Sequence, residues 1–130
     1  PLQGKLHPKN LLDKLLQYQK ILSVPNSVTI IEDFLPFLEK VIEKRITGVL
    51  NAINPGEYEH KDLLELYREK VDPQRQFEYI TREQFEGMTK AARSNCVLST
   101  KKCEELGIAM PAVQESLPKL LDRYQEFLLS

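Results

Sequence analysis

The clearest helical pattern in this sequence is Val113-Gln114-Glu115-Ser116-Leu117-Pro118-Lys119-Leu120-Leu121-Asp122-Arg123-Tyr124. Its apolar residues recur every three or four positions, which is the spacing of one buried face on an amphipathic helix. Pro118 lies inside the pattern, so it should kink this helix or mark its true start. The side chains that we expect this last helix to bury are Val113, Leu117, Leu120, Leu121, Tyr124 and Leu128.

Two helices are predicted near the N-terminus. Leucines and an isoleucine at helical spacing predict a helix over residues 10–22. Asp33 is expected to cap a second helix, from Phe34 to about Arg45, with Pro36 in the first turn, where a missing N–H costs little. The inward-facing residues expected in this second helix are Phe34, Leu38, Val41 and Ile42.

Three more helices follow, each with a start or stop signal. The apolar residues of the third helix, which stops before Pro73, are Leu63, Leu64, Tyr67 and Val71. Thr81 and Gln84 predict a capping box for a short fourth helix. Ser99 or Thr100 should cap a fifth helix, and Gly107 is well placed for a left-handed cap at its end.

Two segments are predicted to be short strands. Residues 28–31 form a β-branched run, and residues 47–53 alternate between two faces before the turn at Asn54-Pro55-Gly56. Two or three short strands are too few to close a sheet, so we expect them to complete a sheet begun elsewhere. The predicted fold is α+β and mostly helical, with about six helices and two or three short strands. A small all-helical bundle with irregular loops is the alternative.

The length and composition are those of one globular domain, with 130 residues, 42% hydrophobic and 28% charged. Eighteen Lys and Arg residues against nineteen Asp and Glu leave a net charge of -1, so no basic excess favours nucleic acid or an anionic membrane. No signal peptide or membrane-spanning stretch is recognisable. Cys96 and Cys103 are too few for a disulfide scaffold, so a cytoplasmic location is expected.

The chain lacks the motifs of nicotinamide-cofactor enzymes. Its five glycines are never closer than eight residues, so neither a dinucleotide fingerprint nor a P-loop is present. None of its five tyrosines has a lysine four positions later. His60 lies among Glu57, Glu59 and Asp62, but zinc needs a second nearby histidine or cysteine, and these acids suit a helix N-terminus. We therefore expect no catalytic, cofactor-binding or metal-binding residue in this chain.

Arg93 is a candidate contact for a phosphate group. It lies in the cluster Ala91-Ala92-Arg93-Ser94-Asn95, before an extended segment. A planar guanidinium can donate to two phosphate oxygens at once, which suits a diphosphate. An ordinary surface arginine is the simpler interpretation of the residues alone.

A series of short motifs gives the chain a wider resemblance. The motifs are His7-Pro8-Lys9-Asn10-Leu11-Leu12, Val24-Pro25-Asn26-Ser27-Val28-Thr29, Gly48 with Asn51 and Asn54-Pro55-Gly56, Ala91-Ala92-Arg93-Ser94-Asn95, Val97-Leu98-Ser99-Thr100-Lys101-Lys102, Leu106-Gly107-Ile108 and Glu115-Ser116-Leu117. In this order they resemble the nucleotide-rhamnose synthase/epimerase-reductase family, known from plants as the bifunctional 3,5-epimerase/4-reductase of UDP-rhamnose synthesis. Bacterial dTDP-4-dehydrorhamnose reductases look like more distant kin.

The resemblance implies the C-terminal part of an extended short-chain dehydrogenase/reductase. Residues 1–130 would form a single C-terminal substrate-binding domain. A Rossmann domain upstream would bind NADPH or NADH and carry a Tyr-x-x-x-Lys pair. The intact enzyme would reduce a UDP- or dTDP-linked 4-keto-6-deoxy sugar in L-rhamnose synthesis, with or without 3,5-epimerisation. This fragment alone would bind no cofactor and catalyse nothing. The opening residues, Pro1-Leu2-Gln3-Gly4, are no start-methionine context, which agrees with a chain cut from a longer protein.

The resemblance also implies three substrate-binding residues. Asn10 matches an asparagine at a helix start near the sugar nucleotide, Arg93 matches an arginine that reaches the diphosphate, and Asn95 is its near neighbour. The sequence departs from the plant pattern at Glu59, where serine is usual, and at Pro118, where leucine is usual. Both departures put helix ends in question.

The expected partners are a nucleotide-diphosphate sugar and the chain's own Rossmann domain, without nucleic acid or membrane; a homodimer stays open. Two other functions also stay open. The first is a non-catalytic, reductase-like regulatory subunit. The second is a small helical protein–protein interaction module, which would expose a large apolar groove. The sequence decides neither between UDP and dTDP nor between NADH and NADPH.

Overall fold

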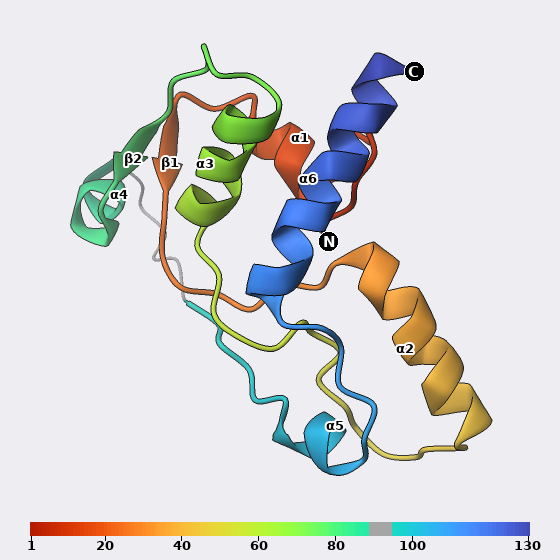
Figure 1. Ribbon diagram of the computed structural model, residues 1–130. Helices are drawn as coiled ribbons and strands as arrows, with labels where there is room; N and C mark the ends of the chain where they lie inside the picture. Colours follow the sequence, from red (N-terminus) through yellow and green to blue (C-terminus); the bar gives the residue numbers. More distant parts are fainter. Residues whose placement is uncertain (89–94) are drawn as a thin grey trace.

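The computed structural model describes residues 1–88 and 95–130 (Figure 1). These residues form six helices and two strands, in agreement with the predicted, mostly helical α+β chain. The elements in chain order are α1 (Leu11–Leu15), β1 (Lys20–Leu22), α2 (Ile31–Glu43), α3 (His60–Lys70), β2 (Glu78–Ile80), α4 (Arg82–Met88), α5 (Lys101–Glu105) and α6 (Val113–Leu129).

The main core lies where α3 and α6 pack together beside α1 (Figure 1). Leu64 of α3 and Leu121 of α6 have 0% of their surface exposed. Each such side chain contributes about 1.5–3 kcal/mol of hydrophobic stabilisation. Tyr67 of α3 meets Tyr124 of α6 edge-on, with ring centroids 6.3 Å apart. The predicted apolar faces of the third and last helices are therefore the faces that make this core.

The two strands form a small parallel sheet in which Ile21 pairs with Tyr79. The sequence predicted one helix as far as residue 22, and this was wrong, because α1 ends at Leu15 and residues 20–22 form β1. The apolar spacing of the segment fits a short helix followed by a strand as well as one long helix. Pairing with residues 78–80, far along the chain, decides between them.

Neither predicted strand forms within the described residues. Ile30 makes only an isolated parallel bridge to Leu2, and α2 begins at the next residue. Residues 47–53 adopt neither helix nor strand. The one sheet in the described parts of the chain consists of β1 and β2, so residues 47–53 have no neighbouring strand to pair with. A strand without hydrogen-bonding partners is not stable in water.

A second, smaller core joins α2 to α5. Ile30, and not the predicted Asp33, occupies the N-cap of α2, so the helix begins at Ile31, three residues before the expected start at Phe34. The predicted inward face was partly wrong, because Leu38 and Ile42 are 39% and 67% exposed, whereas Phe37 is buried. The face of α2 that contains Phe37 is the one that meets α5. The buried residues of this second core are Phe37, Cys103, Ile108 and Met110.

Several helix ends follow their sequence signals. Thr81 and Gln84 make both hydrogen bonds of the predicted capping box, at 2.9 and 3.2 Å. Gly107 adopts the left-handed conformation expected after α5, with φ of +68°. Pro118 lies inside α6, so it does not mark the start of this helix. Leu128 was predicted to be buried but is 43% exposed, because the last turn of α6 extends past the core.

Candidate functional site

A pocket of about 440 Å³ opens between α1, β1, the start of α3 and α4. Pockets of this size accommodate small molecules. The pairing of β1 with β2 places α4, which directly follows β2, beside these two strands (Figure 1), so residues of α1, β1, α3 and α4 line one pocket. The residues that line the pocket are Leu11, Lys14, Leu15, Tyr18, Lys20, Ile21, Leu22, His60 and Phe85.

The pocket combines apolar, aromatic and cationic side chains. Lys14 and Lys20 are exposed and bring two positive charges to it, and none of the described residues that line it is acidic. Tyr18, which is 60% exposed, and Phe85 offer aromatic rings. Aromatic rings stack on flat heterocycles, and lysines attract phosphate. The arrangement therefore suits an anionic ligand that carries an aromatic base.

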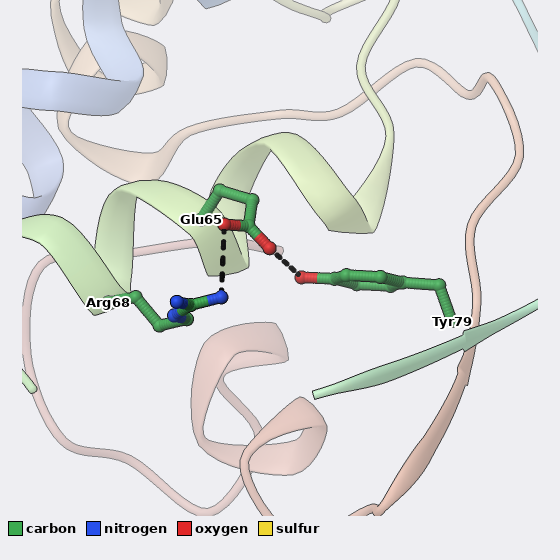
Figure 2. Close-up of polar contacts among 3 residues, drawn as sticks. All are labelled: Glu65, Arg68 and Tyr79. Carbon is green, nitrogen blue, oxygen red and sulfur yellow. Dashed lines mark hydrogen bonds and ion pairs between the residues drawn. The ribbon is translucent and has the colours of Figure 1, made fainter. Parts of the chain in front are cut away.

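Tyr79 fastens β2 to α3, and so supports the β1 wall of the pocket. Its hydroxyl donates to Glu65 Oε1 at 2.9 Å, and Arg68 Nη1 lies 3.5 Å from Glu65 Oε2. Figure 2 shows these three side chains together. Burial, followed by the hydrogen bond with Glu65, raises the pKa of Tyr79. The phenol therefore keeps its proton at neutral pH and stays a donor. The strand pairing gains one further bond, from Glu78 N–H to the Gln19 carbonyl at 3.2 Å.

The first turn of α3 holds His60 at the pocket. The Glu59 N–H donates to Asp62 Oδ2 at 3.0 Å, which caps the helix although serine is absent from position 59. Ser23, directly after β1, accepts a 3.0 Å hydrogen bond from the Lys61 N–H. This bond ties the start of α3 to the end of β1, so the two walls of the pocket are fixed to each other.

Asn10, a predicted substrate-binding residue, directly precedes α1 and is 1% exposed. Its Nδ2 donates to the carbonyls of Gln3 and Lys5, both at 3.0 Å, and to Asp13 Oδ2 at 3.1 Å. Its Oδ1 accepts from the Gln3 N–H at 3.1 Å. Both ends of the amide thus hold the N-terminal segment against the start of α1. The contact of Asn10 with a substrate stays a prediction.

The other two predicted substrate-binding residues come after α4. Arg93 lies outside the described residues. Asn95 is exposed, and the next residue, Cys96, donates its N–H to Asn26 Oδ1 at 2.9 Å, beside the turn that follows β1. No hydrogen bond joins Asn95 to Asn10 in the described parts of the chain, so the structure does not bring these two together directly. Their roles, like that of Arg93, stay predictions.

The described residues contain neither a grouped set of metal ligands nor a membrane-spanning helix. Within residues 1–88 and 95–130, no three His, Cys, Asp or Glu side chains are grouped so as to bind a metal ion. No helix in these ranges has the length and apolar character to cross a membrane. Cys103 lies in the second core, where burial raises the pKa of its thiol, and Cys96 is exposed; both are free.

Sequence reasoning did not identify Lys14, Tyr18, Lys20 or Phe85 as pocket residues. No motif marks them, because they come from α1, the following turn, β1 and α4. The one sequence signal near the pocket was Asn10. It directly precedes α1, the helix that supplies the first of the pocket residues. The wall formed by β1 could not be recognised while residues 20–22 were taken as helix.

No family model matches the chain, but individual proteins do. It is 32% identical, over 88% of its length, to a bifunctional dTDP-4-dehydrorhamnose 3,5-epimerase/dTDP-4-dehydrorhamnose reductase of Arabidopsis thaliana. It is 29% identical, over 92% of its length, to a trifunctional UDP-glucose 4,6-dehydratase/UDP-4-keto-6-deoxy-D-glucose 3,5-epimerase/UDP-4-keto-L-rhamnose-reductase of the same plant. Its fold matches the crystal structure of the UDP-rhamnose synthase from Acanthamoeba polyphaga mimivirus with a TM-score of 0.85 and 31% identity, over 95% of the chain.

The predicted resemblance to the rhamnose synthase/epimerase-reductase family is confirmed. These relatives are much longer proteins. The chain spans 38% of the bifunctional plant enzyme, 18% of the trifunctional one and 43% of the mimivirus rhamnose synthase. The similarity to rhamnose synthases therefore concerns one part of those proteins.

Proposed function

We propose that these residues are the substrate-side part of an NAD(P)H-dependent nucleotide-sugar enzyme of L-rhamnose synthesis. The intact enzyme reduces a UDP- or dTDP-linked 4-keto-6-deoxy sugar, with or without 3,5-epimerisation. The observation that carries the proposal is the match to the mimivirus UDP-rhamnose synthase, because it covers 95% of the chain in both sequence and fold.

In this proposal the pocket beside α1 and β1 binds the nucleoside diphosphate of the substrate. Lys14 and Lys20 attract the phosphates, and their charges are not opposed by acids among the described pocket residues. Tyr18 or Phe85 stacks on the base, a contact that contributes about 1–3 kcal/mol per base in other proteins. Arg93 and Asn95 are proposed to complete the diphosphate contacts.

The reacting groups lie outside these residues in our proposal. A Rossmann domain upstream carries the Tyr-x-x-x-Lys pair and binds NADPH or NADH, which supplies hydride for the reduction. The 130 residues form a single substrate-binding domain that holds the nucleotide end and so positions the sugar. This division agrees with the absence of a glycine fingerprint and of Tyr-x-x-x-Lys from the chain.

An exposed apolar surface supports the presence of such a docking partner. Leu35 and Ile42, which lie on one face of α2, are 59% and 67% exposed, and Val49 is 83% exposed. Val49 belongs to residues 47–53, whose alternating pattern has no strand beside it in the described residues. A sheet in the upstream domain would supply the missing strand and cover these side chains.

The proposal is tested by turnover in the full-length protein. Incubation with UDP-4-keto-L-rhamnose and NADPH should oxidise NADPH and give UDP-rhamnose, identified by mass spectrometry, with the dTDP-linked sugar as the parallel substrate. Formation of UDP-rhamnose from UDP-4-keto-6-deoxyglucose as well would show that the protein also epimerises. A folded protein that binds UDP-rhamnose but converts neither substrate would replace the enzyme with a non-catalytic regulatory subunit. A protein that binds neither nucleotide sugar would contradict both the enzyme hypothesis and the regulatory-subunit hypothesis.

A further inference from the structure

His60 lines the pocket and contacts the buried residue Tyr58. Its Nδ1 lies 2.7 Å from the Tyr58 hydroxyl, and the two rings meet edge to face with centroids 5.5 Å apart. Tyr58 is 2% exposed, and its backbone makes two hydrogen bonds of 2.9 Å with the backbone of Asn26. The phenol is therefore held in place against the imidazole.

The proton in this hydrogen bond belongs to the tyrosine. Burial, with a smaller contribution from the Asp62 carboxylate, raises the pKa of Tyr58, so the phenol is protonated at neutral pH. In the described residues, His60 Nδ1 is the one hydrogen-bond partner of this hydroxyl. A buried O–H without an acceptor costs free energy. Tyr58 therefore donates, and Nδ1 accepts.

The direction of this hydrogen bond determines which nitrogen of the imidazole carries the proton. A neutral histidine that accepts at Nδ1 carries its proton on Nε2. Nε2 lies across the ring from Nδ1, so the edge turned away from Tyr58 is a donor and not an acceptor. Tyr58 does not line the pocket, whereas His60 does. His60 is therefore the member of this pair that a ligand in the pocket can reach.

We propose that His60 is a ligand-binding residue whose Nε2–H donates to an acceptor oxygen of the bound nucleotide, and that Tyr58 is the positioning residue that fixes this donor. Pyrimidine carbonyls and phosphates both present such oxygens. The identity of the ligand rests on the proposed function. The tautomer rests on the contact between Tyr58 and His60 alone, so the two parts can fail separately.

The tautomer is measured by long-range proton–nitrogen NMR of the protein labelled at histidine. The chain has two histidines, and His7→Gln assigns the signals. We expect His60 to be protonated at Nε2, and Tyr58→Phe to shift the ring toward a mixture of tautomers. Tyr79→Phe, which removes the phenol that bonds to Glu65, should leave His60 unchanged. Protonation at Nδ1 in the unmodified protein, or no response to Tyr58→Phe, would overturn the assignment.

The ligand contact is measured by calorimetric titration with UDP, uridine and pyrophosphate. His60→Phe should weaken UDP binding roughly tenfold, the cost of one hydrogen bond, and His60→Gln, which keeps a donor, should recover part of the loss. Whichever of uridine and pyrophosphate shows the same weakening holds the acceptor oxygen. UDP binding that His60→Phe leaves unchanged would overturn the ligand contact alone. No binding of UDP to the unmodified protein would overturn the proposed function together with this contact.

Discussion

The Tyr124 hydroxyl, in α6, donates a 2.5 Å hydrogen bond to Asp13 Oδ1, in α1. The other carboxylate oxygen of Asp13 accepts from Asn10 Nδ2 at 3.1 Å and from the His7 N–H at 2.9 Å. One carboxylate thus joins the N-terminal loop, the first helix and the last helix. Because α1 is a wall of the pocket, this link also fastens the pocket to the main core.

Tyr124→Phe should remove this link and keep the buried ring. A hydrogen bond to a charged acceptor contributes about 1.5–3 kcal/mol, so the free energy of unfolding measured in urea should fall by about 2 kcal/mol. Tyr18→Phe, at a 60% exposed phenol, is the matched control and should change it by less than about 0.5 kcal/mol. Equal stabilities for the two variants would show that the link contributes nothing.

The same bond gives stability a pH dependence on the alkaline side. Burial, followed by the hydrogen bond with Asp13, raises the pKa of Tyr124, so the folded state holds this proton more tightly than the unfolded state. The contribution is fully present below about pH 10, the pKa of a free tyrosine, and is lost as pH rises through the folded pKa. Above about pH 10, the free energy of unfolding should therefore fall less steeply with pH in Tyr124→Phe than in the unmodified protein.

Lys14→Gln and Lys20→Gln should each weaken the binding of UDP. Both lysines are exposed, so screening limits each loss to about two- to fivefold, and the loss should shrink as salt is added. Lys119→Gln is the matched control, because Lys119 is a 64% exposed lysine that pairs with Glu115 on α6, outside the pocket. Equal UDP affinity in all three variants would contradict the proposed position of the phosphates.

Arg93→Ala should impair substrate binding in the full-length protein. If the guanidinium holds the diphosphate, its loss costs about 1.5–3 kcal/mol, and KM for the nucleotide sugar should rise about ten- to a hundredfold. The kcat should fall less, because the contact is away from the reacting carbon, and Arg93→Lys should recover only part of the loss. A wild-type KM in the alanine variant would make Arg93 an ordinary surface residue.

The exposed apolar face of α2 and residues 47–53 should be detectable in the 130-residue chain. We expect the 130-residue chain to self-associate or to bind a hydrophobic dye more than an ordinary monomer does. Replacing Leu35 and Ile42 by serine should reduce dye binding, because both side chains are more than half exposed. If the chain stays monomeric at high concentration and binds no dye, an independent helical module is favoured instead.

The sequence predicted the elements whose signals are local. The apolar faces of α3 and α6 apart from Leu128, the capping box of Thr81 with Gln84 and the left-handed Gly107 were confirmed. Glu59, where the family pattern has serine, still begins α3, because its N–H bonds to Asp62. Such signals act within a few residues, so they do not depend on the rest of the fold.

The elements and site residues that depend on distant parts of the chain were not predicted. β1 exists because residues 20–22 pair with residues 78–80. The alternating pattern of residues 47–53 predicts a strand, but no neighbouring strand pairs with them in the described parts of the chain. The resemblance pointed to Asn10 as a ligand contact, which stays a prediction; its amide also holds the N-terminal segment. Lys14 and Tyr18 of the pocket carry no motif, so only the folded chain reveals them.

In our proposal these residues bind the nucleotide sugar and not the cofactor. The most direct test is a titration of the nitrogen-labelled chain with UDP-rhamnose and, separately, with NADPH, followed by amide NMR. UDP-rhamnose should cause saturable shifts in residues 11–22 and at His60, and NADPH should cause none. Saturable binding of NADPH at micromolar concentration, or UDP-rhamnose without effect on the pocket residues, would contradict the claim.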